Sequence, residues 1–406
     1  MQSRKTVILF TSEFPFGKGE QFIETEIIFL SQRFKEVHII PLNTAGPQRA
    51  IPENARIIKS PLYQPYSRVG MLLRNGLSLL SWYKHQLKIT RHPEKYSGKF
   101  RHYFNYLMHR HADAANLSGI LSSYKGQDVI LYSYWFNVWA TVLLFAKKAG
   151  ELNMPVITRA HGGDLDERQR KSGFFPFRST EMELIDKVIC VSDFGRNLLI
   201  SEYPKAANRI FTQHLGVSDH GINPEPTENI FRIVTCSFVY GLKRLHLVVD
   251  ILSKLKFRID WVHFGEGELL DQLKNQAAQL PSNITCSFPG LVPNETVLKF
   301  YRDNHVDLFM NVSELEGIPV SIMEAISFGI PVTGCRICGV PEIVNSQTGF
   351  LLDKDFDVTE VARLIEEYHG KTDQHKHQFR QGVRDFWFSN FNAGVNYSKF
   401  IDQYLI

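Results

Sequence analysis

Two neighbouring glutamates, Glu316 and Glu324, have the spacing of a site that binds an elongated polar ligand. Pro319 suits the first turn of a helix, and Gly329 followed by Pro331 ends that helix about three turns later. Glu316 is therefore predicted just before the helix N-terminus and Glu324 inside the helix. Roughly 10–15 Å of chain path separates them.

That geometry suits a ligand with a diphosphate in its middle. A helix N-terminus offers free N–H groups and a partial positive charge to phosphate oxygens. The two carboxylates can accept hydrogen bonds from hydroxyl groups on either side. The alternative is that both glutamates are ordinary helix residues, because acids are common in a first turn.

Both halves of the chain alternate short apolar runs with helical patterns. In the first half, strands are predicted at 6–11, 36–41, 129–134, 156–160 and 187–192, and helices at 21–33, 139–149 and 195–202. In the second half, strands are predicted at 231–237, 259–264, 284–288, 307–311 and 331–334, and helices at 245–254, 269–279, 295–302, 319–328 and 358–368. Apolar strands separated by helices indicate parallel, doubly wound sheets, so the predicted class is α/β with two Rossmann-like domains.

The segment 218–229 is polar, rich in proline and glycine, and without periodicity, so it is predicted to be a linker. The predicted domains are 1–217 and 230–385, followed by a C-terminal helix at 386–406. In open sheets of this type, ligands bind outside the carboxyl ends of the strands, so the strand-to-helix loops are where chemistry is expected.

The composition is that of a folded protein in a reducing, cytoplasmic environment. The 406 residues are 44% apolar, and a net charge of +4 is too weakly basic to indicate nucleic acid binding. The five cysteines are scattered, and Cys335 with Cys338 forms a lone CxxC without the partners of a zinc site. The run 129–146 contains polar residues and is predicted as a strand and a helix rather than a membrane span.

Residues 68–111 form a basic, amphipathic stretch. The stretch contains nine Lys/Arg and five His but one acidic residue, Glu94, and apolar and aromatic residues lie between them. This combination favours peripheral contact with an anionic membrane at the inner face of the plasma membrane. The alternative is a solvated basic face of the first domain.

The segment 311–352 carries an ordered set of motifs. Glu316 and Glu324 form E-x7-E, followed by Gly-Ile-Pro-Val, Gly-Val-Pro-Glu-Ile-Val and Thr-Gly. The set resembles the donor-site signature of glycosyltransferase family 4, a retaining family with the GT-B fold. That fold implies two Rossmann-like domains facing across a cleft, with the C-terminal helix packing back on the N-terminal domain. Other segments are similar to members that build bacterial surface polysaccharides such as exopolysaccharide, O-antigen or colanic acid.

This resemblance implies roles for residues around the predicted helix. Glu324 would bind the ribose hydroxyls of a nucleotide, and Glu316 would contact the transferred sugar. The amides of Gly317, Ile318 and Val320 would face the donor.

Two further loops are similar to loops of the family. Lys243 and Arg244 resemble the cations that hold the donor diphosphate, although Phe238 stands where the family usually has arginine. A solvated Lys-Arg pair at a helix start is the alternative. His161, in a loop with Asp164, resembles a histidine that contacts the donor sugar.

Glycine-containing loops complete the predicted site. Gly17 and Gly19 permit close backbone approach to a phosphate or an acceptor, but their surroundings fall short of a dinucleotide fingerprint. Gly265 and Val292 lie in segments that resemble the loops around the nucleotide base.

The resemblance implies transfer of a hexosyl group from a UDP- or GDP-sugar to a glycan or lipid-linked oligosaccharide, with Glu316, His161 and Lys243 as catalytic residues. The nucleotide sugar is a substrate, and no metal or other cofactor is expected. Asp164 and Asp166 spell DxD, a metal signature of another glycosyltransferase fold, but such a short match arises easily by chance. Two alternatives stay open, a catalytically silent sugar-nucleotide or glycan-binding protein and a sugar-nucleotide epimerase.

Overall fold

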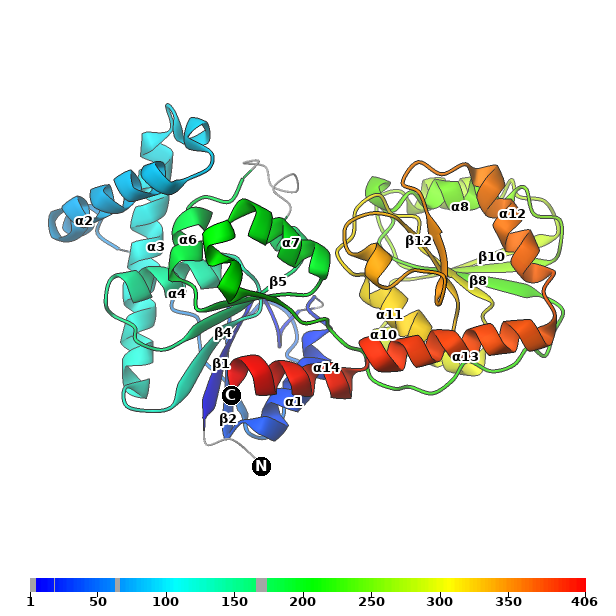
Figure 1. Cartoon of the computed structure of the whole chain (residues 1–406), viewed down its shortest axis with the longest axis horizontal. Helices are drawn as coiled ribbons and strands as arrows, with labels where there is room; N and C mark the ends of the chain where they lie inside the picture. The colour runs from blue at the N-terminus through cyan, green and yellow to red at the C-terminus, as the bar shows by residue number, and fades with distance from the viewer. Residues whose placement is uncertain (1–4, 18, 63–65, 166–173) are drawn as a thin grey trace. The chain divides into compact units, whose positions relative to one another are not determined.

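The computed structural model describes residues 5–17, 19–62, 66–165 and 174–406. The chain divides into two compact units, Met1–Gln213 with Tyr397–Ile406, and His214–Asn396. Each unit contains one parallel sheet with helices along its faces (Figure 1).

The first unit is built on a seven-stranded sheet in the order β3-β2-β1-β4-β5-β6-β7, in which every pairing is parallel. Its strands are β1 (Thr6–Thr11), β2 (Glu36–Pro41), β3 (Ala55–Ile57), β4 (Val129–Ser133), β5 (Val156–Ala160), β6 (Lys187–Cys190) and β7 (Ile210–Thr212). Its helices are α1 (Ile23–Arg33), α2 (Arg68–Ile89), α3 (Phe100–Leu121), α4 (Val138–Lys148), α5 (Gly162–Leu165), α6 (Arg178–Leu184) and α7 (Asp193–Glu202).

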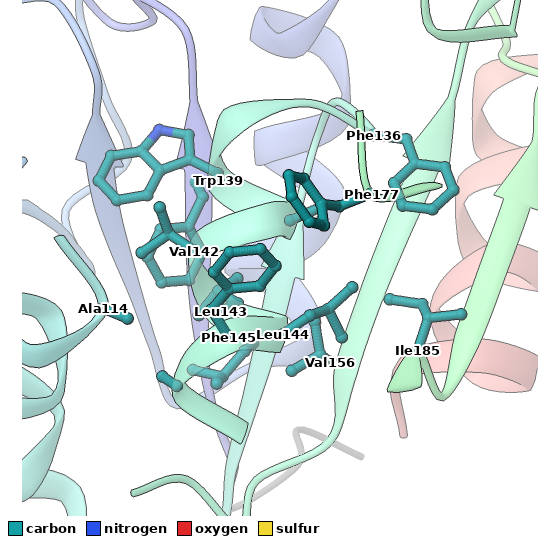
Figure 2. Close-up of a cluster of buried hydrophobic side chains, with 14 of the residues drawn as sticks. Ala114, Phe136, Trp139, Val142, Leu143, Leu144, Phe145, Val156, Phe177 and Ile185 are labelled. Carbon is teal, nitrogen blue, oxygen red and sulfur yellow. The ribbon is translucent and has the colours of Figure 1, made fainter. Parts of the chain in front are cut away.

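The central strands are largely apolar because helices cover both faces of this sheet. Along β1, Val7 and Leu9 belong to one buried layer, and Ile8 and Phe10 to the other. Figure 2 shows the second layer, where Leu143 and its neighbours on α4 pack with aromatic rings from adjoining loops. The run 129–146 is therefore β4 followed by the buried helix α4, as predicted.

The C-terminal segment packs on the first unit, which confirms the prediction that it returns to the N-terminal domain. Helix α14 (Ala393–Phe400) continues as a π-helical turn, Ile401–Leu405, and Phe400 is buried in the same layer as β1 residues Val7 and Leu9. The predicted single helix at 386–406 is wrong. Instead, α13 (Asp373–Asn390) ends with Phe391 as its C-cap, and the backbone of Asn392 forms a bridge with Val217 before α14 begins.

The second unit contains a six-stranded parallel sheet in the order β10-β9-β8-β11-β12-β13. Its strands are β8 (Phe231–Cys236), β9 (Ile259–Phe264), β10 (Ile284–Gly290), β11 (Leu308–Met310), β12 (Val332–Cys335) and β13 (Gly349–Leu352). Its other helices are α8 (Leu245–Leu252), α9 (Leu270–Ala277), α10 (Asn294–Asp303), α11 (Val320–Ser327) and α12 (Val358–His369).

The segment 218–229, predicted as a linker, contains no helix or strand but is fixed within the second unit. The buried side chain of Asn223 donates to Asn304 O at 2.7 Å and accepts from the amide of Val306 at 2.9 Å. The guanidinium of Arg380 also donates to the Asn223 side chain, at 2.6 Å. One asparagine thus anchors the start of the unit to α10 and α13.

Most predicted strands and helices lie within a few residues of the observed ones. The elements that were not predicted are short edge strands (β3, β7 and β13) and several helices, among them α2, α3, α6 and α13. In α13 the buried residues are Arg380, Val383 and Trp387, too few to create a strong apolar stripe. No helix in the described ranges is long and apolar enough to cross a membrane.

Candidate functional site

In each sheet, one pair of neighbouring strands has connections that lead to the next strand toward opposite edges of the sheet. In the first sheet this pair is β1 and β4, and in the second it is β8 and β11. Loops that leave two such strands diverge, and the crevice between them is where open α/β sheets bind ligands. Most of the predicted site residues follow one of these four strands.

Lys243 and Glu316 meet between β8 and β11. Lys243 ends a short 3-10 turn after β8, and Glu316 lies in the loop after β11. The Lys243 Nζ atom is 2.6 Å from Glu316 Oε1, and Asn311 Nδ2 donates to the same oxygen at 3.2 Å. Both side chains stay partly exposed. The structure therefore brings together a cation and a carboxylate, predicted separately, beyond the carboxyl ends of β8 and β11.

Helix α11 begins at Val320, one residue after the predicted start, with Pro319 as its N-cap. The side chain of Ile318 is buried beneath this turn. Within the described part of the chain, the amides of Gly317, Ile318 and Val320 have no hydrogen-bond acceptor. The start of the helix therefore offers N–H groups to an anion near Glu316.

Arg244 holds neighbouring loops together through its side chain. Its backbone is left-handed, with φ 49°. Its guanidinium donates to Val312 O at 2.8 Å, Lys354 O at 2.8 Å and Cys335 Sγ at 3.2 Å. All three nitrogens are thus engaged by the protein, which gives Arg244 a structural position and leaves Lys243 beside Glu316. One of these acceptors, Cys335, is the first cysteine of the lone CxxC motif.

Glu324 lies inside α11, one face of which is buried, and its Oε1 accepts a hydrogen bond from Asn294 Nδ2 at 2.8 Å. Removal from water raises the pKa of Glu324 to about 7, against the opposing effect of the Asn294 hydrogen bond. A carboxyl group with this pKa can change its charge near neutrality. Glu316 precedes the helix and Glu324 lies within it, as predicted.

We expect Glu324 to make stability depend on pH. Its pKa is about 7 in the folded protein and 4.5 ordinarily, so the folded state holds the proton more tightly between these values. The stability from this group should therefore be fully present below pH 4.5, fall as pH rises from 4.5 to about 7, and then level off. Thermal denaturation of the wild type and Glu324→Gln across pH 4.5–8 tests this. The difference in Tm between them should change over that interval, and a constant difference contradicts the assignment.

His161 follows β5 in the first unit and lies among aromatic rings. Its ring is stacked on Tyr134 with centroids 5.0 Å apart and lies 4.4 Å from Trp135. In the described residues neither ring nitrogen has a hydrogen-bond partner, and Nδ1 lies 3.6 Å from the Asp164 carboxylate. Asp164 instead accepts from the His161 backbone amide at 3.1 Å. The predicted DxD partner, Asp166, lies outside the described residues.

The loop after β1 is organised by Glu20, a residue that sequence reasoning missed. Its carboxylate accepts hydrogen bonds from the amides of Ser12 at 3.0 Å, Glu13 at 2.7 Å and Phe14 at 2.7 Å. The indole of Trp135, after β4, donates to the same carboxylate. Glu20 thus joins the two loops at the switch point of the first sheet. The sequence signal that could have indicated Glu20 is an acidic residue directly after the run that contains Gly17 and Gly19.

Gly17 and Gly19 approach a neighbouring side chain rather than open space. A Cβ at Gly17 would lie 2.8 Å from Glu13 Oε2, and one at Gly19 would lie 2.1 Å from Glu13 Oε1. Gly17 also has φ +65°, which favours glycine. The two glycines therefore let Glu13 fold over the loop, and their predicted contact with a ligand stays a prediction.

Gly265 and Val292 follow β9 and β10. Gly265 has φ +142°, and a Cβ there would lie 1.9 Å from Ser237 O, so only glycine fits between the loops after β8 and β9. Its amide donates to Gly290 O at 2.9 Å, which joins it to the loop containing the half-buried Val292. These loops lie at the carboxyl ends of their strands, where the predicted base contacts require them.

The two sheets and their switch-point residues define the GT-B class, and comparison with solved structures confirms the fold predicted from the sequence. The lipopolysaccharide outer core galactosyltransferase WaaB, apo form, is 15% identical with a TM-score of 0.65, and the match covers 97% of this chain and 99% of that one. HepE of Anabaena, solved in complex with UDP-glucose, is 14% identical with a TM-score of 0.62, and the match covers 98% of both chains.

Residues 222–385 match the model of the family described as glycosyl transferases group 1. WcaL of Escherichia coli strain K12, provisionally named a colanic acid biosynthesis glycosyltransferase, is 24% identical over 264 residues. That match covers 58% of this chain and 64% of WcaL, which is less than two thirds of the relative. The predicted resemblance to bacterial surface-polysaccharide glycosyltransferases is confirmed, and assignment to family 4 in particular stays a prediction.

Proposed function

We propose that this protein is a retaining glycosyltransferase that moves a hexosyl group from a UDP- or GDP-sugar to a lipid-linked oligosaccharide in cell-surface polysaccharide synthesis. The observation that carries the proposal is the Lys243–Glu316 pair, 2.6 Å apart, at the switch point of a group 1 glycosyl transferase domain. The name of WcaL supports the polysaccharide context, and the family resemblance supports retention.

The residues of the second unit have complementary tasks in this proposal. Lys243 and the free amides at the start of α11 stabilise the negative charge that develops on the departing diphosphate. Glu316 positions the transferred sugar, and Glu324 accepts hydrogen bonds from the ribose hydroxyls.

The bond between the anomeric carbon and the diphosphate oxygen breaks, and a bond to the acceptor oxygen forms on the same face. The acceptor proton passes to the departing diphosphate. The positive charge in this scheme comes from the protein, so it requires no metal. Activity that is lost in a chelator and restored by a divalent ion contradicts this part of the proposal.

A thermal-shift panel of UDP-, GDP- and ADP-glucose tests donor binding. Binding to the folded state raises stability by about 2.7 kcal/mol at a ligand concentration of 100 Kd, so at least one of the three should raise Tm by several degrees. Analysis of sugar products, with and without extracted lipid-linked oligosaccharide, then tests transfer. The absence of a shift with all three sugar nucleotides contradicts the proposal.

A catalytically silent sugar-nucleotide-binding protein is the second candidate. Phe238 occupies the usual arginine position, and Arg244 is engaged with backbone oxygens. Fewer positive charges are therefore available to bind the diphosphate than the family pattern implies. Binding without release of the nucleoside diphosphate favours this candidate. An altered sugar nucleotide formed without acceptor indicates an epimerase.

We also propose that α2 rests on an anionic membrane, the inner face of the plasma membrane in a cytoplasmic protein. Figure 1 shows α2 lying across α3 and extending beyond it. Val69, Leu73 and Leu77 share one face of α2, and Leu73 and Leu77 are 83% and 87% exposed. The helix also carries exposed basic side chains, including Arg74 and Lys84. An exposed apolar row beside basic residues is typical of a helix lying in a membrane interface.

The double substitution Leu73→Glu with Leu77→Glu should weaken vesicle binding by about 100-fold or more, because burying each leucine contributes about 1.5–3 kcal/mol. Sedimentation with phosphatidylglycerol-containing vesicles measures this. Phe388→Glu, at an exposed apolar residue of α13, is the matched control and should bind like the wild type. If the wild type, the double variant and the control bind vesicles equally, or if the wild type does not bind vesicles, the basic stretch is a solvated face instead.

A further inference from the structure

The loop between β8 and α8 exposes apolar side chains beside Lys243. Phe238 is 51% exposed, Tyr240 45% and Leu242 49%. The rings of Phe238 and Tyr240 are stacked, with centroids 5.7 Å apart and planes inclined by 23°. Exposed large apolar groups that gather in one short loop are typical of a binding surface.

This loop is held in place by the neighbouring loops. Val239, between the two aromatic residues, is 2% exposed, and its amide donates to Glu266 O at 3.0 Å. Its carbonyl accepts from the amide of Leu269 at 3.2 Å. Because alternate residues of an extended segment point in opposite directions, anchoring Val239 inward directs Phe238 and Tyr240 outward. The aromatic pair is therefore pre-organised.

The aromatic pair also lies close to the charged part of the site. The Lys243 amide donates to Tyr240 O at 2.9 Å, which closes a tight turn between them. The Glu314 amide donates to Leu242 O at 2.9 Å and joins this turn to the loop that carries Glu316. One side of the loop thus offers a cation and a carboxylate, and the other offers two aromatic rings.

A phosphate group fits the Lys243 side of this loop but not the aromatic side, because rings next to an anion remove water without supplying hydrogen bonds. A pyranose ring fits the aromatic side. Its C–H groups can lie against the negatively charged faces of the rings, while its hydroxyl groups stay at the edge in water.

We propose that Phe238 and Tyr240 form a stacking surface for a pyranose ring, supplied either by the donor sugar or by the acceptor glycan. This inference rests on the proposed function and adds a sugar contact at the position where the family pattern has a phosphate-binding arginine. At this position, the chain therefore has an aromatic ring that contacts sugar in place of the charged side chain of the family pattern.

Isothermal titration of the wild type, Phe238→Ala and Tyr240→Ala tests the inference. The ligands are the sugar nucleotide among UDP-, GDP- and ADP-glucose that raises the wild-type Tm most, and its nucleoside diphosphate alone. A second arm titrates the methyl α- and β-glycosides of glucose, galactose and mannose into protein saturated with that nucleoside diphosphate. Phe388→Ala, an exposed aromatic residue of α13, is the control, and Phe238→Trp should retain binding.

Loss of one ring should weaken sugar binding by about 5- to 20-fold. Weaker binding of the sugar nucleotide with unchanged binding of the diphosphate assigns the donor sugar, and weaker binding of a methyl glycoside alone assigns the acceptor. Equal weakening of the sugar nucleotide and its diphosphate indicates stacking on the base and overturns the inference. Unchanged binding in both arms also overturns it. If the wild type binds none of the sugar nucleotides, the proposed function fails first, so the two failures are distinguishable.

Discussion

Replacing Lys243 with alanine should lower the rate of sugar transfer by about 100- to 1000-fold, the usual effect of removing one group that stabilises a developing anion. Lys243 Nζ is 2.6 Å from Glu316 Oε1, and the neighbouring Arg244 is engaged by Val312 O and Lys354 O. Among the residues that the structure describes, Lys243 is the cation paired with Glu316, so we expect the loss not to be compensated. Release of nucleoside diphosphate from the best-bound sugar nucleotide measures the rate.

Lys299→Ala is the matched control for this prediction. Lys299 forms an exposed pair with Asp303 on α10, and an exposed pair of this kind contributes about 0–1 kcal/mol. The control should therefore keep the wild-type rate and nearly the wild-type Tm. Lys243→Arg keeps the charge and should recover part of the rate. A Lys243→Ala protein that transfers sugar as fast as the wild type contradicts the proposed role of the pair.

The largest expected loss of stability follows from Glu26→Gln in the first unit. Glu26 on α1 and Arg159 on β5 are fully buried, with Arg159 Nη2 3.3 Å from Glu26 Oε2. Tyr132 donates to Glu26 at 2.7 Å and accepts from Arg159 Nε at 2.8 Å. The Arg159 guanidinium also lies over the ring of Phe400, 3.9 Å from its centroid. One ion pair thus ties α1, β5 and the C-terminal segment together.

Removing the carboxylate leaves the arginine charged and buried. Burial lowers the pKa of Arg159, and in the wild type Glu26 opposes that effect. In the variant, the guanidinium still keeps its proton, because the ordinary pKa of arginine lies far above neutral pH. Breaking a buried pair in this way costs about 3–5 kcal/mol. In a domain of this size that corresponds to a fall in Tm of about 6–20 °C.

Glu24→Gln, on the same helix, controls for the loss of a carboxylate. Glu24 pairs with Arg49 at 2.7 Å, and its side chain is half exposed, so this substitution should cost no more than about 1 kcal/mol. Thermal or urea denaturation of the two variants measures the contrast. Equal losses of stability from Glu24→Gln and Glu26→Gln would contradict the larger contribution assigned to the buried pair.

The sequence by itself determined the α/β class, two doubly wound sheets and most strand positions. Strands such as β1, β5 and β9 were predicted because apolar side chains are required on both faces of a covered parallel sheet. The spacing of Glu316 and Glu324 on either side of the start of α11 was also predictable, because the helix signals around Pro319 are local.

Only the tertiary structure decided which side chains meet. Lys243 and Glu316 are 73 positions apart, and they meet because β8 lies beside β11. Strand order is a long-range choice that periodicity within each element does not encode. The left-handed backbone of Arg244 likewise turns its side chain toward Val312 O. The joining of two loops by Glu20 depends in the same way on β1 lying beside β4.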